Sequence, residues 1–269
     1  MKDNLLVIGG GTMGGGIVKQ LLKNGAYSTE QCAVVERDED KISALKSIGV
    51  RIFADLSQCS IADYRAILLA VKPQDASELL AELKNKISRE QLVISIMAGV
   101  SLQTLEQGLA KARVVRTMPN IAATVGKGVI AWISRSATED DRAYFGKIFG
   151  ALGTALEVSS DDAIDRITAI AGCGPGYLYR FAQDLVQAAV ALGIDQLTAL
   201  RLVKATISGA SALYEQSNQT PEELVKQVAS KGGATEAALA VLNDAQTAAI
   251  WEKAVAAAYA RAHKLGNNK

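Results

Sequence analysis

A short apolar run followed by closely spaced glycines near the N-terminus restricts the possible folds of this chain more than any other feature. Leu5 to Ile8 predict a buried strand, and Gly9, Gly11 and Gly14 follow it at the spacing of a dinucleotide-binding loop. In such a loop the first glycine permits a tight turn, the second lets the backbone approach a pyrophosphate, and the third allows close helix packing. An acidic residue, Glu36, ends a second apolar run at the distance that the pattern requires. The sequence therefore predicts a nucleotide-binding βαβ unit.

Further apolar runs in the N-terminal half predict strands at residues 50–53, 66–70, 92–96, 114–115 and 129–133, with a loop at 118–120. Helical stretches separate the early strands, which is typical of a parallel, doubly wound sheet with a ligand at its carboxyl edge. We therefore expect an α/β N-terminal Rossmann domain. Its loops at residues 9–13, 70–73 and 96–100 should line that edge.

The pattern changes near residue 160. From Asp161 the chain is rich in alanine with helical periodicity, and it predicts helices at residues 175–192, 197–214 and 245–265. We therefore divide the chain into a dinucleotide-binding Rossmann domain at residues 1–160 and an all-helical dimerisation and substrate domain at residues 161–269. The apolar content of the second domain exceeds the needs of a small bundle, so we predict a homodimer formed through its helices. A self-contained monomeric bundle is the alternative.

A second glycine-rich turn, Ser230 to Thr235, precedes an apolar helical run in the C-terminal half. A helix start presents unpaired N–H groups and a partial positive charge, which together suit a carboxylate or a phosphate. The hydroxyl of Thr235 can both donate and accept a hydrogen bond. The turn is therefore a candidate anion site, and an ordinary helix cap is the alternative.

Composition narrows the class of protein. The net charge of +1 and the apolar fraction of 49% favour a soluble globular protein without a basic footprint for nucleic acid. We expect no membrane span, because no apolar run reaches the roughly 18 to 20 residues that a bilayer requires. The N-terminus enters the first strand at once, so we expect no signal peptide.

The cysteines indicate a reducing compartment and no metal site, and the single histidine argues against catalysis by a core histidine. Cys32, Cys59 and Cys173 are odd in number and lack the spacing of a metal site, so we expect a cytoplasmic protein without a metal. The single histidine, His263, lies in a polar C-terminal tail and is expected to be solvated. Catalysis by a core histidine is therefore not expected.

The chain resembles the pyrroline-5-carboxylate reductase family along nearly its whole length. The ordered motifs that carry the resemblance are the first glycine loop, Ala70-Val71-Lys72-Pro73-Gln74, Ser95-Ile96-Met97-Ala98-Gly99-Val100, Arg116-Thr117-Met118-Pro119-Asn120, the run from Thr168 to Tyr177, and Ser230 to Thr235. The resemblance implies reduction of 1-pyrroline-5-carboxylate to L-proline with NADPH or NADH, which is the last step of proline biosynthesis. It also implies a Rossmann domain joined to a helical dimerisation domain, and in some members a larger ring of dimers.

The resemblance implies roles for individual residues. The pyrophosphate of the cofactor is expected at the backbone of Ile8, Gly9, Gly10, Gly11, Thr12 and Met13, and the nicotinamide and its ribose are expected to be flanked by Ala70, Val71, Lys72 and Pro73 and by Met97, Ala98 and Gly99. The carboxylate of the cyclic imine is expected at Ser230, Gly233, Ala234 and Thr235. Thr235 is the expected catalytic residue, with its hydroxyl near the ring nitrogen. A cyclic imine accepts a proton more readily than a ketone, so the chemistry does not require a strong acid.

Several positions depart from the family pattern. Thr12 and Leu56 stand where members usually carry asparagine, and Leu56 loses a polar contact to the adenosine half of the cofactor. Cys173 stands in a motif that commonly has serine, a change between small residues that keeps the packing. Lys231 replaces a common proline before the paired glycines. Either Lys231 is a solvated lysine, or its charge assists the substrate carboxylate or marks a related substrate.

The residues after the second strand bear on the choice of cofactor. Glu36 can bond the 2′-hydroxyl of NADH and would repel the 2′-phosphate of NADPH, whereas Arg37 could accommodate that phosphate. Members of the family generally use NADPH. We predict that this protein tolerates NADH unusually well.

Three rival functions fit parts of the sequence. β-Hydroxyacid dehydrogenases place a catalytic lysine shortly after a glycine cluster, but here no lysine follows Gly176 before Lys204. An NAD(P)H-dependent imine reductase with a different imino-acid substrate stays open because of the departures above. A nucleotide-sensing homologue without catalysis is disfavoured by the presence of Thr235 and of the paired glycines.

Overall fold

The computed structural model of the protein describes residues 3–267, which form two compact units. The first unit contains the residues up to Cys173 together with those from Ala258 onward, and the second contains Gly174–Ala257. Helix α11 (Thr247–Asn267) contributes to both units. The predicted domain boundary at residue 161 coincides with the start of α6 (Asp161–Ile167), a helix of the first unit, and it stays a prediction.

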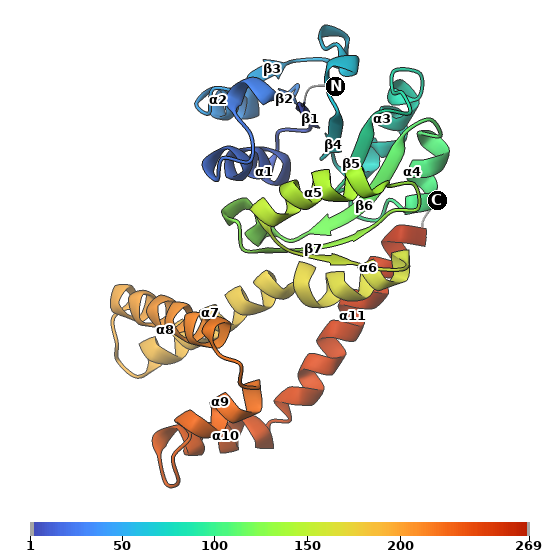
Figure 1. Cartoon of the computed structure of the whole chain (residues 1–269). Helices are drawn as coiled ribbons and strands as arrows, with labels where there is room; N and C mark the ends of the chain where they lie inside the picture. The colour runs from blue at the N-terminus through green and yellow to red at the C-terminus, as the bar shows by residue number, and fades with distance from the viewer. Residues whose placement is uncertain (1–2, 268–269) are drawn as a thin grey trace. The chain divides into compact units, whose positions relative to one another are not determined.

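An eight-stranded sheet is the framework of the first unit (Figure 1). Its strands are β1 (Leu5–Ile8), β2 (Cys32–Val35), β3 (Arg51–Phe53), β4 (Ala66–Leu69), β5 (Leu92–Ser95), β6 (Arg113–Pro119), β7 (Gly128–Ile133) and β8 (Gly153–Glu157). The order is β3-β2-β1-β4-β5-β6-β7-β8, and every neighbouring pair is parallel except β6 with β7. The predicted α/β fold with a mainly parallel sheet is confirmed.

The structure corrects two details of the predicted strands. Met118 and Pro119, predicted as part of a loop, belong to β6 because they pair with β7 in the antiparallel register. Strand β8 has no counterpart among the predicted strands. Most of its residues are exposed, so its sequence carries no apolar run.

Helices cover both faces of the sheet, because successive residues of a strand point to opposite faces. Leu6 and Ile8 of β1 join one apolar cluster, to which α3 (Ala76–Leu83), α4 (Leu102–Gly108) and α6 also contribute. Leu5 and Val7 join a second cluster with α1 (Thr12–Lys23), α2 (Glu39–Lys46) and α5 (Glu139–Leu152). The alternation shows that β1 is buried on both faces, as its uninterrupted apolar sequence predicts.

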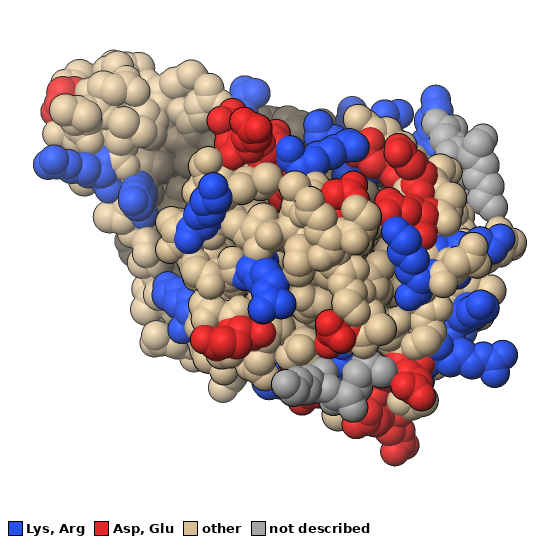
Figure 2. Space-filling view, turned by 90° about the horizontal axis from the view of Figure 1, so that it is seen from above, with Lys and Arg blue, Asp and Glu red and all other residues tan. Residues whose placement is uncertain are grey.

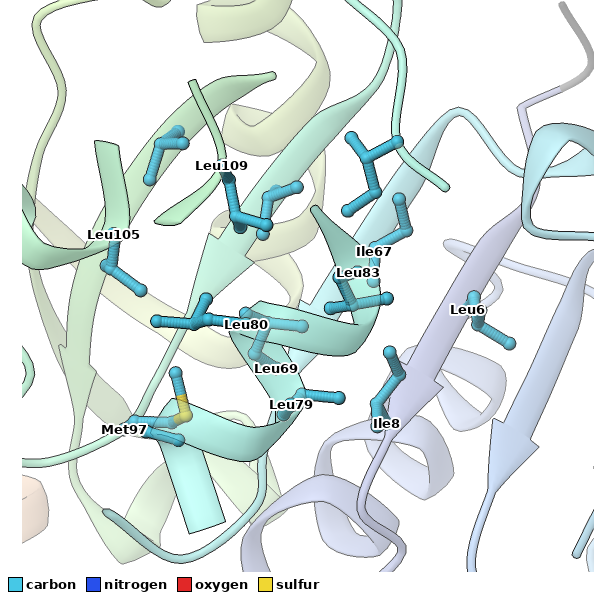
Figure 3. Packing of buried hydrophobic residues seen from close by; sticks show 14 of the residues in the cluster. Leu6, Ile8, Ile67, Leu69, Leu79, Leu80, Leu83, Met97, Leu105 and Leu109 are labelled. Carbon is cyan, nitrogen blue, oxygen red and sulfur yellow. The ribbon is translucent and has the colours of Figure 1, made fainter. Parts of the chain in front are cut away.

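The first apolar cluster reaches the carboxyl edge of the sheet. Figure 3 shows Leu79, Leu80 and Leu83 of α3 packed beside Leu69 of β4. Met97, from the loop that follows β5, lies in the same cluster and is buried (Figure 3). The core therefore fixes the start of a loop that the sequence assigns to the cofactor.

The second unit is all-helical, as predicted. It contains α7 (Gly174–Ala191), α8 (Gln196–Gln216), α9 (Pro221–Val228), α10 (Ala234–Asp244) and the first part of α11. Its buried cluster is small and contains Val186, Ala199 and Val203. Large apolar side chains stay exposed in the single chain, among them Phe181, Leu200 and Ile250. These helices therefore leave many of their large apolar side chains exposed in the single chain.

Charges are mixed on the first unit. On the face shown in Figure 2, basic and acidic side chains lie among one another over much of the surface. This distribution agrees with the near-zero net charge of the sequence. Within residues 3–267, no helix combines the length and the apolar character that a membrane crossing requires.

Candidate functional site

The glycine loop packs closely against the residue that follows β4. Gly9 has φ +104, and a methyl group on it would lie 2.6 Å from the carbonyl oxygen of Ala70. A methyl group on Gly14 would lie 2.0 Å from the carbonyl oxygen of Gly9 and 2.9 Å from the Cβ of Ala70. The two glycines thus allow the first turn of α1 to pack on the end of β1. The roles predicted for Gly9 and Gly14 agree with this packing.

Next to these tight contacts the loop is open. A methyl group on Gly11 would meet no atom within 4 Å, and Gly11 caps α1 without any side-chain hydrogen bond to the helix start. A pocket of 460 Å³ covers this region, and its lining includes Gly10, Thr12, Lys19 and Lys41. Free helix N–H groups, an open glycine and two lysines suit a pyrophosphate. The residues present therefore fit the dinucleotide that the sequence predicts.

Glu36 holds the glycine loop to the end of β2. Its carboxylate accepts hydrogen bonds from the backbone N–H groups of Gly10 at 2.8 Å, Arg37 at 2.9 Å and Asp38 at 3.0 Å. The residue is buried, whereas the side chain of Arg37 is exposed. The predicted acid thus lies beside the loop as expected. It also has a structural role that the sequence pattern does not reveal.

The other predicted cofactor loops share the edge with the glycine loop. Strands β1, β4 and β5 are parallel neighbours, so their carboxyl ends meet at one edge of the sheet. The loop after β4 contains Ala70, Val71, Lys72 and Pro73, and the loop after β5 contains Met97, Ala98 and Gly99. Lys72 and Pro73 are exposed, while the others are buried or partly buried. The structure therefore brings all three predicted loops together.

The loop after β5 has a backbone conformation that requires glycine at one position. Ser95 accepts a hydrogen bond from the N–H of Met97 through its hydroxyl at 3.3 Å. Gly99 has φ +73, and a methyl group on it would lie 2.8 Å from the carbonyl oxygen of Leu265. Ser101 then caps α4 by accepting the N–H of Thr104 at 3.1 Å. Glycine is required at position 99 both for its φ and for the close approach of α11.

A buried ion cluster lies behind this loop. The guanidinium of Arg116 on β6 pairs with Asp161 and, at 3.2 Å, with Asp165 on α6. Asp161 also accepts the N–H of Leu102, the first residue of α4, at 3.1 Å. The side chain of Arg116 is only 4% exposed. Arg116 lies within one of the quoted motifs, but its acidic partners are 45 and 49 residues away and no local pattern indicates them.

His263 is exposed, as expected, but it also lies close to acidic side chains of α6. Its Nδ1 lies 3.6 Å from a carboxylate oxygen of Asp165, and its ring lies 5.9 Å from that of Tyr259. The hydroxyl of Tyr259 donates to Asp162 at 2.5 Å, and this bond holds the pKa of Asp162 below its usual range. No local pattern indicates these contacts, because α6 and the end of α11 are about a hundred positions apart in the chain.

The candidate anion turn lies in the second unit. Gly232 has φ +73, and the N–H of Gly233 donates to the carbonyl of Ser230 at 2.9 Å. Helix α10 begins at Ala234, so Thr235 lies in its first turn, and Gly233 provides no side-chain cap. Glu236, which sequence reasoning missed, accepts the N–H of Gly232 at 2.7 Å. The predicted turn and helix start are therefore present, with an acid beside them.

The structure shows the surroundings of two residues that depart from the family pattern. Leu56 is buried in the first apolar cluster, so its side chain serves the core. The side chain of Lys231 is exposed in the turn before α10. The structure thus gives Leu56 a packing role and leaves both readings of Lys231 as hypotheses.

Similarity to known proteins covers the whole chain. A family model described as pyrroline-5-carboxylate reductase dimerisation matches residues 161–265, and one described as NADP oxidoreductase coenzyme F420-dependent matches residues 4–99. A pyrroline-5-carboxylate reductase of Methanosarcina acetivorans is 35% identical over 262 residues, which are 96% of each chain.

Solved structures agree. The structure of a pyrroline-5-carboxylate reductase from Coxiella burnetii matches with a TM-score of 0.91 and 33% identity over 100% of both chains. The Plasmodium falciparum pyrroline carboxylate reductase, solved with NADP bound, matches with a TM-score of 0.88 and 26% identity over 99% of both chains.

Proposed function

The chain belongs to the pyrroline-5-carboxylate reductase family, and we propose that it reduces 1-pyrroline-5-carboxylate to L-proline with NADPH or NADH, in the last step of proline biosynthesis. The observation that carries this proposal is the 35% identity to a named reductase over 96% of both chains. The test is a panel of five- and six-membered cyclic imino acids, with cofactor oxidation followed spectroscopically. Turnover of another ring would favour the alternative imine reductase, and binding without turnover would favour a nucleotide-sensing homologue.

The first unit supports the cofactor half of this proposal. The backbone of Gly10, Gly11 and Thr12 and the start of α1 would hold the pyrophosphate, and the loops after β4 and β5 would flank the nicotinamide. When bound, NAD(P)H supplies the hydride that reduces the imine carbon. The chain's part is to hold the two reactants in a fixed orientation, which can supply much of the barrier reduction.

The turn before α10 would bind the substrate. Unpaired N–H groups at Ala234 and Thr235 and the hydroxyl of Ser230 would hold the carboxylate of the imine. The hydroxyl of Thr235 would lie at the ring nitrogen, where it can hold the iminium form or relay its proton. Lys231 is exposed in the same turn, where its charge would assist the carboxylate.

Replacing Thr235 with alanine should lower kcat by about a hundredfold, which is the low end of the usual contribution of a proton-transferring side chain. Thr235→Ser keeps the hydroxyl and should restore most of the rate. Thr198→Ala is a matched control, because Thr198 also lies in the first turn of a helix, α8. An unchanged rate in Thr235→Ala at the optimal pH would remove this residue from the mechanism.

The environment of Glu36 supports unusually good use of NADH. Its buried carboxylate would face the 2′-phosphate of NADPH but could accept a bond from the 2′-hydroxyl of NADH. We expect kcat/KM for NADPH to exceed that for NADH by less than about 100-fold, or roughly 2.7 kcal/mol. Glu36→Gln removes the charge and keeps one acceptor oxygen, for the N–H of Gly10, while its NH2 group replaces the oxygen that accepts from Arg37 and Asp38. It should shift the ratio toward NADPH. A wild-type preference for NADPH beyond that limit would contradict the prediction.

A homodimer in the cytoplasm completes the proposal. The dimerisation family model spans α6 to α11, and the exposed apolar side chains of α7, α8 and α11 would be covered by a second copy. Larger rings of dimers are proposed only by analogy with the family. Burial raises the pKa of Cys32 to about 12, and Cys32, Cys59 and Cys173 are all free thiols, which suits a reducing compartment.

A further inference from the structure

The end of α11 touches the loop that follows β5. Residues from Ala258 onward belong to the first unit, so this contact lies within one compact body. At Gly99 the backbone of the loop approaches the carbonyl of Leu265 so closely that a single methyl group would lie 2.8 Å from its oxygen. Contact between two backbones leaves little freedom for the loop to move without the helix.

Two side chains in the same part of α11 contact carboxylates of α6. The hydroxyl of Tyr259 donates to Asp162 at 2.5 Å, and Nδ1 of His263 lies 3.6 Å from Asp165. Residues 259 and 263 are one helical turn apart, so both point to the same face of α11. The helix end therefore faces the carboxylates of α6 at two successive turns, with a hydrogen bond from Tyr259 and a close approach of His263.

Helix α6 in turn holds the far end of the loop. Asp161 accepts the N–H of Leu102, where α4 begins, and both Asp161 and Asp165 pair with the buried Arg116. At its near end the loop is fixed by Met97, which is 2% exposed in the core. In the middle of the loop, α11 makes its contact at Gly99.

We propose that residues 258–266 act as a strap that positions the loop from Met97 to Val100, with Tyr259 and His263 as positioning residues. The acidic groups on α6 that face the strap are Asp162 and Asp165, and Asp161 belongs to the same cluster. The guanidinium groups of Arg116 and Arg166 balance two of these three carboxylates. The strap thus packs within the first unit against α6, which presents carboxylate acceptors to it.

The consequence for the enzyme rests on the proposed function, which sets the nicotinamide against Met97, Ala98 and Gly99. If the strap positions this loop, a variant that loosens the strap should weaken cofactor binding more than binding of the imine. The substrate turn lies in the second unit and Tyr259 in the first, so the bond from Tyr259 to Asp162 is not one of the contacts that would hold the imine carboxylate. A split between the two KM values therefore distinguishes positioning of the loop from general damage.

Two variants with matched controls test the strap. Gly99→Ala adds a methyl group at φ +73 that would collide with Leu265, whereas Gly25→Ala adds one at φ +75 where no atom lies within 4 Å. Tyr259→Phe removes the hydroxyl that donates to Asp162 and that also interacts with Arg166, and Tyr214→Phe makes the same change on an exposed tyrosine of α8. The primary readout is amide hydrogen exchange of a peptide covering residues 96–102, measured on the full chain without cofactor.

We expect faster exchange of this peptide in Gly99→Ala and in Tyr259→Phe than in their controls. We also expect the KM for NAD(P)H to rise about three- to tenfold in Tyr259→Phe, the effect of losing one net hydrogen bond, with the KM for the imine nearly unchanged. Exchange that equals the matched control in either variant overturns the strap. A wild-type enzyme that reduces no cyclic imine would contradict the proposed function instead, and the exchange comparison would still decide the strap.

Discussion

Gly14→Ala should abolish cofactor binding and destabilise the first unit by about 3 kcal/mol or more, at or above the usual upper range for overpacking. The added methyl group would lie 2.0 Å from the carbonyl oxygen of Gly9, which is backbone and cannot rotate away. Gly9 cannot retreat either, since it already lies against the backbone of Ala70. The first turn of α1 must therefore lift off β1, and the N–H groups that would hold the pyrophosphate move with it. Isothermal titration with NAD(P)H and thermal unfolding measure the two effects.

Two other glycines separate cofactor binding from stability. Gly11→Ala places its methyl group where no atom lies within 4 Å, so the free protein should keep its stability while the cofactor loses its approach to the backbone. Gly146→Ala, at an open position within α5, should stabilise the protein by about 0.5 to 1 kcal/mol and leave binding unchanged.

Normal cofactor affinity in Gly14→Ala would show that the loop does not hold the pyrophosphate.

Arg116→Met should produce the largest loss of stability among changes outside the glycine loop. It removes the positive charge that Asp161 and Asp165 share, and the side chain of Asp165 is only 9% exposed. Removing one partner of a buried ion pair costs about 3 to 5 kcal/mol, because the other charge stays buried without compensation. The thermal midpoint should fall by roughly 10 °C for a chain of this size.

The matched control for this change is Arg166→Met on α6. Arg166 pairs with Asp162 at 2.8 Å, but its side chain is 71% exposed. An exposed pair contributes at most about 1 kcal/mol, and often nothing measurable. Equal thermal midpoints for the two variants would contradict the buried cluster as described.

Local sequence patterns predicted most of the cofactor-binding part of the first unit. Leu5 to Ile8 alternate between two apolar clusters, so an uninterrupted apolar run was sufficient to indicate a strand buried on both faces. Gly9 and Gly14 lie at tight backbone contacts because the spacing of the motif reflects those contacts. The resemblance to a family added which loops should hold which part of the cofactor.

Contacts between distant segments could not be predicted in the same way. The partners of Arg116 and Tyr259 lie 45 to 97 positions away, and no local periodicity records such pairs. Glu36 was predicted as a ligand for the ribose, but a motif does not reveal that its oxygens also accept three backbone N–H groups. Strand β8 was missed because an exposed edge strand needs no apolar run.

The route of the chain between the two units has a consequence for dissecting the protein. Residues on both sides of Gly174–Ala257 belong to the first unit, so the helical unit is an insertion within the nucleotide-binding fold and not an appendage at its end. A fragment that stops at Cys173 would lack the segment that contacts Gly99, and would expose the acidic groups of α6. An autonomous nucleotide-binding module would need a linker in place of the insertion, with residues 258–267 retained.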